Sequence, residues 1–480
     1  MPKRCARLGA VWMNLLNQRW PWLVAAAAII LAFLSTVVEI NLPREIDSRP
    51  VGSADDIARL RERTDTNVLF VLIDTLRADR LSSYGYERET SPEIDRHAST
   101  GVRFARHLAQ SSWTKCSMAS LWTGLNPARS GITRYDDVIP GEARLPAETL
   151  KEAGFQTVGL YRNGWVAPTF GFDQGFDVYT RPAARPLPPS VRLENPTISA
   201  RGTDEDVIAS AIEFLRVNGD ERWFLYLHLM DVHEYLYDEE TALFGGAYTD
   251  IYDNSIRWVD RVIGVLLEHL ADQGHFDDTL VVISSDHGEA FRERGYEGHA
   301  RKVFRETTEV PFFLAFPFRL EPGVVVDVRT RNVDVWPTVL DLIGLEPPPG
   351  IDGRSLVPEI LASARGEAPP GEELTGIAHL DQHWGQRNRK PSPTVAVTDG
   401  ALRYVRMDEP GGRRVEQLFD ASQDPGELED RSADDPAAVA RLRAMADAYL
   451  ETSAPWGPAP TREIDEMELN QLRALGYAIP

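Results

Sequence analysis

The run VLFVLID, residues 68–74, decides the fold class, because six apolar residues in a row end at one carboxylate. Continuous apolar runs of this length are typical of strands that are buried on both faces, as in a parallel sheet. Asp74 would be expensive to bury at the end of such a strand unless it were paired or bound to a metal ion. Similar runs predict further strands at 157–161, 223–230, 279–283 and 311–316.

Helical periodicity occupies stretches between these runs, at 147–153, 205–217 and 254–272. Strands that alternate with helices predict an α/β fold with a large, mostly parallel sheet sandwiched by helices. The pattern changes after 335–344, where three prolines end a helix. Short strand patterns then predict a smaller C-terminal antiparallel sheet, which a helix completes; the segments are 394–398, 402–405, 416–419 and, for the helix, 436–450.

The N-terminal residues lie outside this globule. Residues 21–38 carry no charge, and the run is just long enough for a transmembrane helix. Basic residues precede it and Glu39 is the first charge after it, which predicts a cytoplasmic N-terminus and a catalytic domain on the extracytoplasmic (periplasmic or extracellular) side. A cleaved signal peptide is the alternative; it is disfavoured because residues 35–37 are a poor small-x-small cleavage site.

Four parts are therefore expected: a cytoplasmic N-terminus and transmembrane anchor (1–41), a linker (42–66), a catalytic α/β domain (67–370), and a smaller C-terminal subdomain with a tail (371–480). The net charge of −22 argues against a nucleic-acid partner, which would need a basic surface. The two cysteines, Cys5 and Cys116, fall on opposite sides of the predicted membrane, so no intrachain disulfide is expected.

Three stretches carry the candidate chemistry. Asp74 and Asp286-His287 both follow predicted buried strands, and α/β sheets bind ligands at the carboxyl ends of their strands. Two carboxylates and an imidazole there predict a site for Mg²⁺, Mn²⁺, Ca²⁺ or Zn²⁺. In SWTKCSMASLWTG, residues 112–124, Thr114 and Cys116 are rival nucleophiles just ahead of a helix start. A threonine hydroxyl beside a cation and a helix N-terminus would be acidified by both.

After residue 66, short motifs follow one another along nearly the whole chain: NVLFVLIDTLRAD (67–79), SPEID (91–95), TGLNP (123–127), GFDQGFD (171–177), SDHGE (285–289), VP (310–311), DGRSL (352–356), LFD (418–420) and DPGE (424–427). In this order they resemble the sulfatase family of the alkaline phosphatase superfamily. The resemblance implies an alkaline-phosphatase-like fold and a metal-dependent ester hydrolase.

The resemblance also distinguishes the two nucleophiles. Family sulfatases carry a cysteine, matured to formylglycine, nine positions before the threonine of a Thr-Gly pair. Counting back nine residues from Thr123 gives Thr114, whereas Cys116 falls on the family's proline position. Read from Cys116, the segment lacks the proline or alanine at +2 and the arginine at +4. A threonine nucleophile is similar to that of the phosphorus-handling members, which include nucleotide pyrophosphatases, phosphonoacetate hydrolases and envelope phosphoethanolamine and lipoteichoic-acid transferases.

Supporting roles are also implied by the resemblance. Asp74, Thr114, Asp286 and His287 would hold one metal ion, and a second would need ligands from the segment 231–233. His233 and His299 would bind the charged oxygens, and His299 could protonate the leaving oxygen. Candidate substrate contacts are Arg77, Lys115, Asn163 and Asp231. His379 and His383 are candidate late metal ligands, although a surface loop is the favoured interpretation for both.

The predicted function is that of a membrane-anchored metallohydrolase that cleaves a sulfate-, phosphate- or phosphonate-type ester through Thr114. Its partner would be an anionic ester, with an envelope glycan or lipid among the candidates. Three alternatives stay open: an envelope phospho-group transferase of the phosphoethanolamine- or glycerophosphate-transferase type, a formylglycine sulfatase that uses Cys116, and a non-catalytic binding module.

Overall fold

The structure is a computed structural model that describes residues 22–26, 47, 49–196, 202–371, 373–386, 389–408, 412–464, 469–470 and 472. Residues 1–48 and 49–480 form two separate compact units. Most of the predicted membrane span at 21–38 lies outside the described residues. Among the helices that are described, none is both long enough and apolar enough to span a bilayer.

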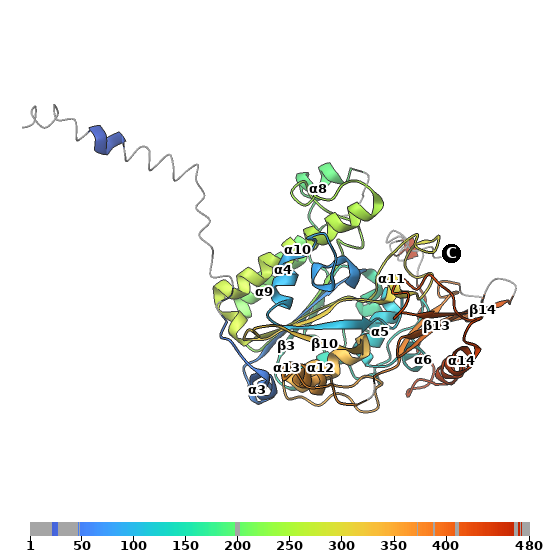
Figure 1. Ribbon diagram of the computed structural model, residues 1–480. Helices are drawn as coiled ribbons and strands as arrows, with labels where there is room; N and C mark the ends of the chain where they lie inside the picture. The colour runs from blue at the N-terminus through green and yellow to red at the C-terminus, as the bar shows by residue number, and fades with distance from the viewer. Residues whose placement is uncertain are drawn as a thin grey trace, which may run out of the picture. The chain divides into compact units, whose positions relative to one another are not determined.

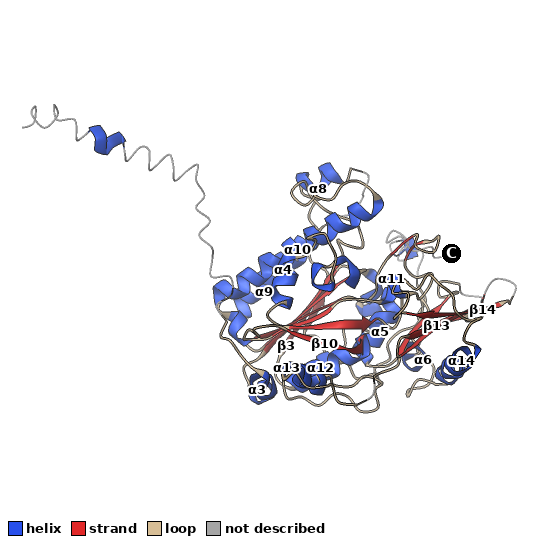
Figure 2. Ribbon diagram, viewed as in Figure 1, coloured by secondary structure: helices blue, strands red, loops and turns tan. Residues whose placement is uncertain are grey.

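A large sheet, drawn in red in Figure 2, forms the centre of residues 49–480. Its eight strands follow the order β10-β2-β9-β6-β1-β5-β3-β4. Every pairing is parallel except the two that β9 makes with β2 and β6, so the sheet is mixed but mostly parallel, as predicted. The strands are β1 Asn67–Ile73, β2 Val102–Leu108, β3 Gln156–Tyr161, β4 Val178–Thr180, β5 Trp223–Leu229, β6 Thr279–Ser284, β9 Phe312–Ala315 and β10 Val324–Arg331.

The pleat of β1 explains why its sequence is apolar throughout. Phe70 and its alternate neighbours face one hydrophobic core, while Val71 and its alternate neighbours face the other. Helices cover both faces of the sheet (Figure 1). One core includes α5 Thr114–Thr123, α7 Pro146–Glu152, α12 Val335–Leu342 and α13 Val357–Ala364; the other includes α4 Pro92–Ala98, α9 Asp204–Asn218 and α10 Tyr248–Gln273. The shorter helices are α3 Ala54–Arg59, α6 Pro127–Ser130, α8 Pro189–Glu194 and α11 Arg305–Thr308.

A second, four-stranded antiparallel sheet follows in the C-terminal part of the chain, in the order β11-β12-β13-β14. Helix α14, Pro436–Leu450, packs on it through Val439, Leu442 and Ala446. The predicted small antiparallel sheet is therefore confirmed, with one strand more than the sequence patterns indicated. The strands are β11 Gly376–Asp381, β12 Pro393–Asp399, β13 Leu402–Asp408 and β14 Arg414–Asp420, and a separate hairpin pairs β7 Ala290–Phe291 with β8 Glu297–Gly298.

The parallel register brings three chain segments to one edge of the large sheet. Ile73 pairs with Leu229 of β5, and Leu72 pairs with Ser284 of β6. The residues that follow these strands therefore leave the sheet side by side. Asp74 is one of them, and the 285–288 loop begins beside it.

Candidate active site

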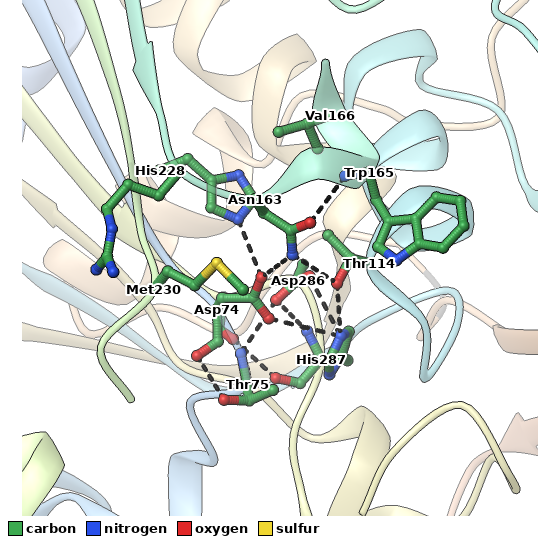
Figure 3. Close-up of polar contacts among 12 residues, drawn as sticks. Asp74, Thr75, Thr114, Asn163, Trp165, Val166, His228, Met230, Asp286 and His287 are labelled. Atoms are coloured by element: carbon green, nitrogen blue, oxygen red, sulfur yellow. Dashed lines mark hydrogen bonds and ion pairs between the residues drawn. The ribbon is translucent and has the colours of Figure 1, made fainter. Parts of the chain in front are cut away.

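Asp74, Asp286 and His287 meet at this carboxyl edge, fully buried, with one candidate ligand atom from each within 4.8 Å of the others (Figure 3). Asp74 Oδ1 and Asp286 Oδ2 accept no hydrogen bond from any described residue. His287 Nδ1 donates to the carbonyl oxygen of Gly288 at 3.0 Å, so its Nε2 carries the lone pair. Two buried carboxylate oxygens and an imidazole lone pair, oriented by a second contact, fit a divalent cation.

Each carboxylate is fixed through its other oxygen. Asp74 Oδ2 accepts hydrogen bonds from Asn163 Nδ2 at 2.6 Å and from His228 Nε2 at 3.1 Å. Asp286 Oδ1 accepts the backbone N–H groups of Thr75 and His287, at 3.3 and 2.9 Å. Burial, together with the Asp74 carboxylate, raises the pKa of Asp286 to about 7. A bound cation would remove this repulsion by supplying the opposite charge.

Thr114 is the first residue of α5, and the helix points its N-terminus at this cluster. Its Oγ1 lies 3.1 Å from His287 Nε2 and 3.4 Å from Asn163 Nδ2. Ser117, one turn further along α5, donates to the carbonyl oxygen of Asp286 at 2.6 Å. This bond ties the helix to the loop that follows β6. The structure thus brings Thr114, Asp286 and His287 together, as the sequence predicted.

His233 and His299 lie next to the cluster. The His299 ring stacks on the ring of His287, with centroids 4.6 Å apart, and the His233 ring lies 4.9 Å from that of His299. Burial lowers the pKa of both His233 and His299 to about 4. In the isolated protein at neutral pH they are therefore neutral imidazoles.

Two predicted substrate contacts are engaged elsewhere. The guanidinium of Arg77 forms ion pairs with Asp79 and Glu293 at 2.7 and 2.5 Å. Lys115 donates from Nζ to the carbonyl oxygen of Tyr135 at 2.7 Å. The roles assigned to them remain predictions, and in this structure both cations contact protein groups. Asn163, in contrast, lies inside the cluster.

Asp231 belongs to a separate buried network. It accepts hydrogen bonds from Trp258 Nε1 at 2.7 Å and from the backbone of Asp204 at 2.8 Å, and it pairs with Arg162. Among the residues that the structure describes, Asp74, Asp286 and His287 form the one group of three or more side chains close enough to share an ion. The structure therefore does not build a second metal site at 231–233.

His379 and His383 do not belong to this group either. His379 lies buried in β11 rather than on a surface loop, and its Nδ1 is 3.0 Å from Tyr449 Oη. The surface-loop interpretation was wrong for His379, because the strand that contains it had not been recognised. His383 Nδ1 donates to the carbonyl oxygen of Lys390 at 2.9 Å.

Sequence reasoning missed His228 and Glu289. His228 is a polar residue in an otherwise apolar strand, and that contrast was the available signal. Tyr226 Oη lies 2.7 Å from its Nδ1, while its Nε2 contacts Asp74. Glu289 closes the SDHGE motif, and its carboxylate lies 3.0 Å from Nδ1 of His299.

The backbone is strained beside several of these residues. Thr75 directly follows Asp74 with a φ of 63°, and Ala300 directly follows His299 with a φ of 54°. Tyr235, in the loop after β5, has a φ of 56°. Residues with side chains adopt this left-handed conformation at a cost of about 1–3 kcal/mol each, so the surrounding structure must hold them there.

The fold and the site together define an α/β enzyme with a candidate metal centre at the carboxyl edge of its sheet. Residues 66–345, more than half of the chain, match the sulfatase family model. The chain therefore belongs to the sulfatase family of the alkaline phosphatase superfamily, whose members are metal-dependent, and it is a sulfatase-like ester hydrolase.

Several proteins named as sulfatases are similar in sequence to this chain over most of their own length. Human N-acetylgalactosamine-6-sulfatase is 26% identical over 82% of this chain and 87% of that protein. Choline-sulfatase of Rhizobium meliloti (strain 1021) is 24% identical over 81% of this chain and 87% of that protein. Rattus norvegicus steryl-sulfatase is 25% identical over 62% of this chain and 70% of that protein.

Solved structures show the same fold. A 2-O GAG sulfatase superposes with a TM-score of 0.66 at 19% identity, over 83% of this chain and 98% of that chain. The phosphonate monoester hydrolase of Agrobacterium radiobacter superposes with a TM-score of 0.63 at 20% identity, over 83% of this chain and 100% of that chain.

Proposed function

We propose that this protein hydrolyses a sulfate-, phosphate- or phosphonate-type ester with Thr114 as the nucleophile. The observation that carries the proposal is the position of Thr114 Oγ1, 3.1 Å from His287 Nε2 at the start of α5. Relatives named for sulfate esters support the substrate class. Asp74, Asp286 and His287, with the Thr114 hydroxyl, would hold one divalent cation.

Cys116 is the rival nucleophile, and its surroundings do not favour it. Cys116 lies two residues after Thr114 in α5, and two residues of an α-helix correspond to a rotation of about 200°. The side chain of Cys116 therefore points away from that of Thr114. Its Sγ lies 3.8 Å from the carbonyl oxygen of His379, in the C-terminal sheet. Burial raises the pKa of this thiol to about 12, and thiols in such surroundings are unreactive. Conversion of Cys116 into a catalytic group is therefore not supported.

The residues at the site suit an in-line displacement. Thr114 loses its hydroxyl proton to solvent as Oγ1 bonds to the sulfur or phosphorus atom, and the bond to the leaving oxygen breaks. Asn163 Nδ2, 3.4 Å from Oγ1, would orient the nucleophile. His233 and His299 would donate hydrogen bonds to the ester oxygens, and His299 would protonate the leaving oxygen. A divalent cation, when bound, would lower the pKa of the hydroxyl and offset the charge of the ester. Water then hydrolyses the threonine ester.

Three variants test the nucleophile: Thr114→Ala, Thr114→Ser and Cys116→Ala, assayed on aryl sulfate, aryl phosphate and phosphonate monoester substrates with added Mg²⁺, Mn²⁺, Ca²⁺ or Zn²⁺. We expect Thr114→Ala to lose turnover, Thr114→Ser to keep part of it and Cys116→Ala to keep nearly all. Peptide mass analysis should show an unmodified cysteine at position 116. Loss of turnover in Cys116→Ala with retention in Thr114→Ala would contradict the proposal.

We also propose that residues 21–38 anchor the enzyme to a membrane with its catalytic domain on the extracytoplasmic side. The support is the uncharged run itself and the basic residues that precede it. Fractionation should place the full-length protein with membranes, and deletion of 1–41 should release it. A mature chain that begins after residue 35 would contradict the anchor.

A further inference from the structure

Glu289 is a buried acid at the site to which the proposed function gives no role. Its Oε2 lies 3.0 Å from Nδ1 of His299, and the two side chains are 2% and 12% exposed. Two polar groups removed from water in this way stabilise each other mainly through the hydrogen bond between them.

A short hairpin sets the separation of the two residues. Ala290 of β7 pairs antiparallel with Gly298 of β8. One step further along the same register, Glu289 lies opposite His299. Directly opposed residues in an antiparallel pair project to the same side, so the hairpin itself directs both side chains to one place.

Contacts at the base and at the turn hold this hairpin. Arg77 Nη1 donates to the carbonyl oxygen of Glu289 at 2.8 Å, which fixes the base. At the turn, Arg294 forms an ion pair with Glu306 at 3.1 Å and donates to the carbonyl oxygen of Gly426 at 3.1 Å. The last contact belongs to the DPGE motif of the C-terminal part. The hairpin is therefore attached both to the loop that follows β1 of the large sheet and to the loop that follows β14 of the smaller one.

We propose that Glu289 is a positioning residue that orients His299 toward the leaving group of the ester. This inference rests on the proposed roles of Thr114 and His299. Because Glu289 contacts Nδ1, the proposal assigns Nε2 of His299 to the leaving oxygen of the ester. The His299 ring stacks on the ring of His287, a candidate metal ligand, which keeps it next to the site.

The proton balance follows from this arrangement. One proton lies between Glu289 Oε2 and His299 Nδ1, and a second is carried by Nε2. When the bond from sulfur or phosphorus to the leaving oxygen breaks, the Nε2 proton passes to that oxygen and the shared proton stays within the pair. The water that later cleaves the threonine ester adds its hydroxyl to sulfur or phosphorus and gives its proton to Nε2, and Thr114 Oγ1 takes back from solvent the proton that it lost in the first step.

The test compares two esters of one acid, a 4-nitrophenyl ester with a good leaving group and a phenyl ester with a poor one. A leaving group that departs as a stable anion needs little protonation. We expect His299→Ala to lower kcat on the phenyl ester by about 10²–10⁴-fold, the usual contribution of a general acid, and to affect the 4-nitrophenyl ester far less. Glu289→Ala and the isosteric Glu289→Gln should show the same selectivity with a smaller loss.

The double variant Glu289→Ala/His299→Ala should be no slower than His299→Ala alone, because residues that act as one unit have non-additive effects. Glu297→Gln is the matched control, because Glu297 lies in the same hairpin. Its carboxylate pairs with Arg292, and its side chain is 43% exposed. It should leave kcat unchanged on both esters.

Two results would overturn the inference: equal losses on both esters in the Glu289 variants, or additive losses in the double variant. Failure of the proposed function looks different. If Thr114→Ala kept turnover on both esters, the nucleophile would be wrong, while the coupling between Glu289 and His299 could still be measured.

Discussion

The side-chain amide of Asn163 donates a hydrogen bond to the carboxylate of Asp74 at 2.6 Å, across from the loop after β3 to the end of β1. The backbone N–H of Trp165 donates to the other end of the same amide at 2.8 Å, so the direction of the amide is fixed. Its Nδ2 therefore presents both of its protons to the site, one toward Asp74 and one toward Thr114. One uncharged side chain thus contacts both a carboxylate of the candidate metal centre and the proposed nucleophile.

The first expected outcome concerns this amide. Asn163→Ala should lower kcat/KM and weaken metal binding by about 10–100-fold, the usual effect of losing a group that orients a metal ligand. Calorimetric titration with Mn²⁺ and an ester assay measure the two effects. Asn218→Ala, at the end of α9, is the control, because among the described residues the Asn218 side-chain amide donates to the carbonyl oxygen of Phe214, within its own helix, and to no group of the site. Equal behaviour of the two variants would show that the contact does not orient Asp74.

Removal of the metal ion should destabilise the protein in a pH-dependent way. The folded-state pKa of Asp286 is raised to about 7 in the absence of an ion. A carboxyl group whose pKa is higher in the folded than in the unfolded protein stabilises the fold while it is protonated. That contribution is lost as the pH rises through the folded-state pKa. Chelation should therefore lower Tm more at pH 8 than at pH 6. Adding the metal ion back to a free concentration of about 100 times its Kd should raise the free energy of unfolding by about 2.7 kcal/mol. A Tm difference that did not grow with pH would contradict this account.

His379 should make the fold sensitive to acid. Burial lowers its folded-state pKa to about 4, whereas the unfolded value is about 6.5. The unfolded chain binds the extra proton between these values, so the free energy of unfolding should fall as pH drops from 6.5 to 4, by at most about 3 kcal/mol. His379→Gln can still hydrogen-bond Tyr449 but does not titrate. Urea unfolding at several pH values should show a shallower decline in this variant than in the wild type.

Gly288 should be intolerant of a side chain. A Cβ at this position would lie 2.3 Å from the carbonyl oxygen of Glu306, a backbone atom that cannot rotate away. Gly288→Ala must therefore shift the loop that carries Asp286 and His287, and a displacement of about 1 Å can lower the rate about 10²-fold. Gly141→Ala is the matched control, since its Cβ would meet no atom within 4 Å. Similar kcat values for both variants would show that the loop can adapt.

Strand positions were predictable from sequence where both faces are buried. β1, β5 and β6 each appear as a mainly apolar run, and the residues that follow β1 and β6 therefore identified the edge that carries the candidate metal centre. β2, β4 and β10 were missed because parts of all three strands are exposed, so their sequences mix polar and apolar residues. The antiparallel direction of β9 was also missed, because direction depends on the path of the chain before the strand.

Residue positions were predictable where the local sequence decides them. The segment 112–124 predicted a helix start next to Thr114, and α5 begins at Thr114; its role as the nucleophile, which the spacing to Thr123-Gly124 favoured, remains a proposal. The partner of Asp231 could not be foreseen, since Arg162 lies far away in sequence and only the folded chain pairs them. His228 was hidden for a related reason. A histidine in a buried strand can face either side of the sheet, and the sequence alone does not show that the carboxylate of Asp74 lies next to His228.

The left-handed backbone at Thr75 and Ala300 sets a limit on how this enzyme can be improved. Glycine at either position would relieve about 1–2 kcal/mol of steric strain, because glycine adopts positive φ without penalty. The same change would loosen the chain directly beside Asp74 or His299. Part of that gain is offset, because glycine loses more backbone freedom on folding than other residues do. Variants selected for stability alone could therefore gain little at these two positions while losing the backbone restraint next to the candidate site.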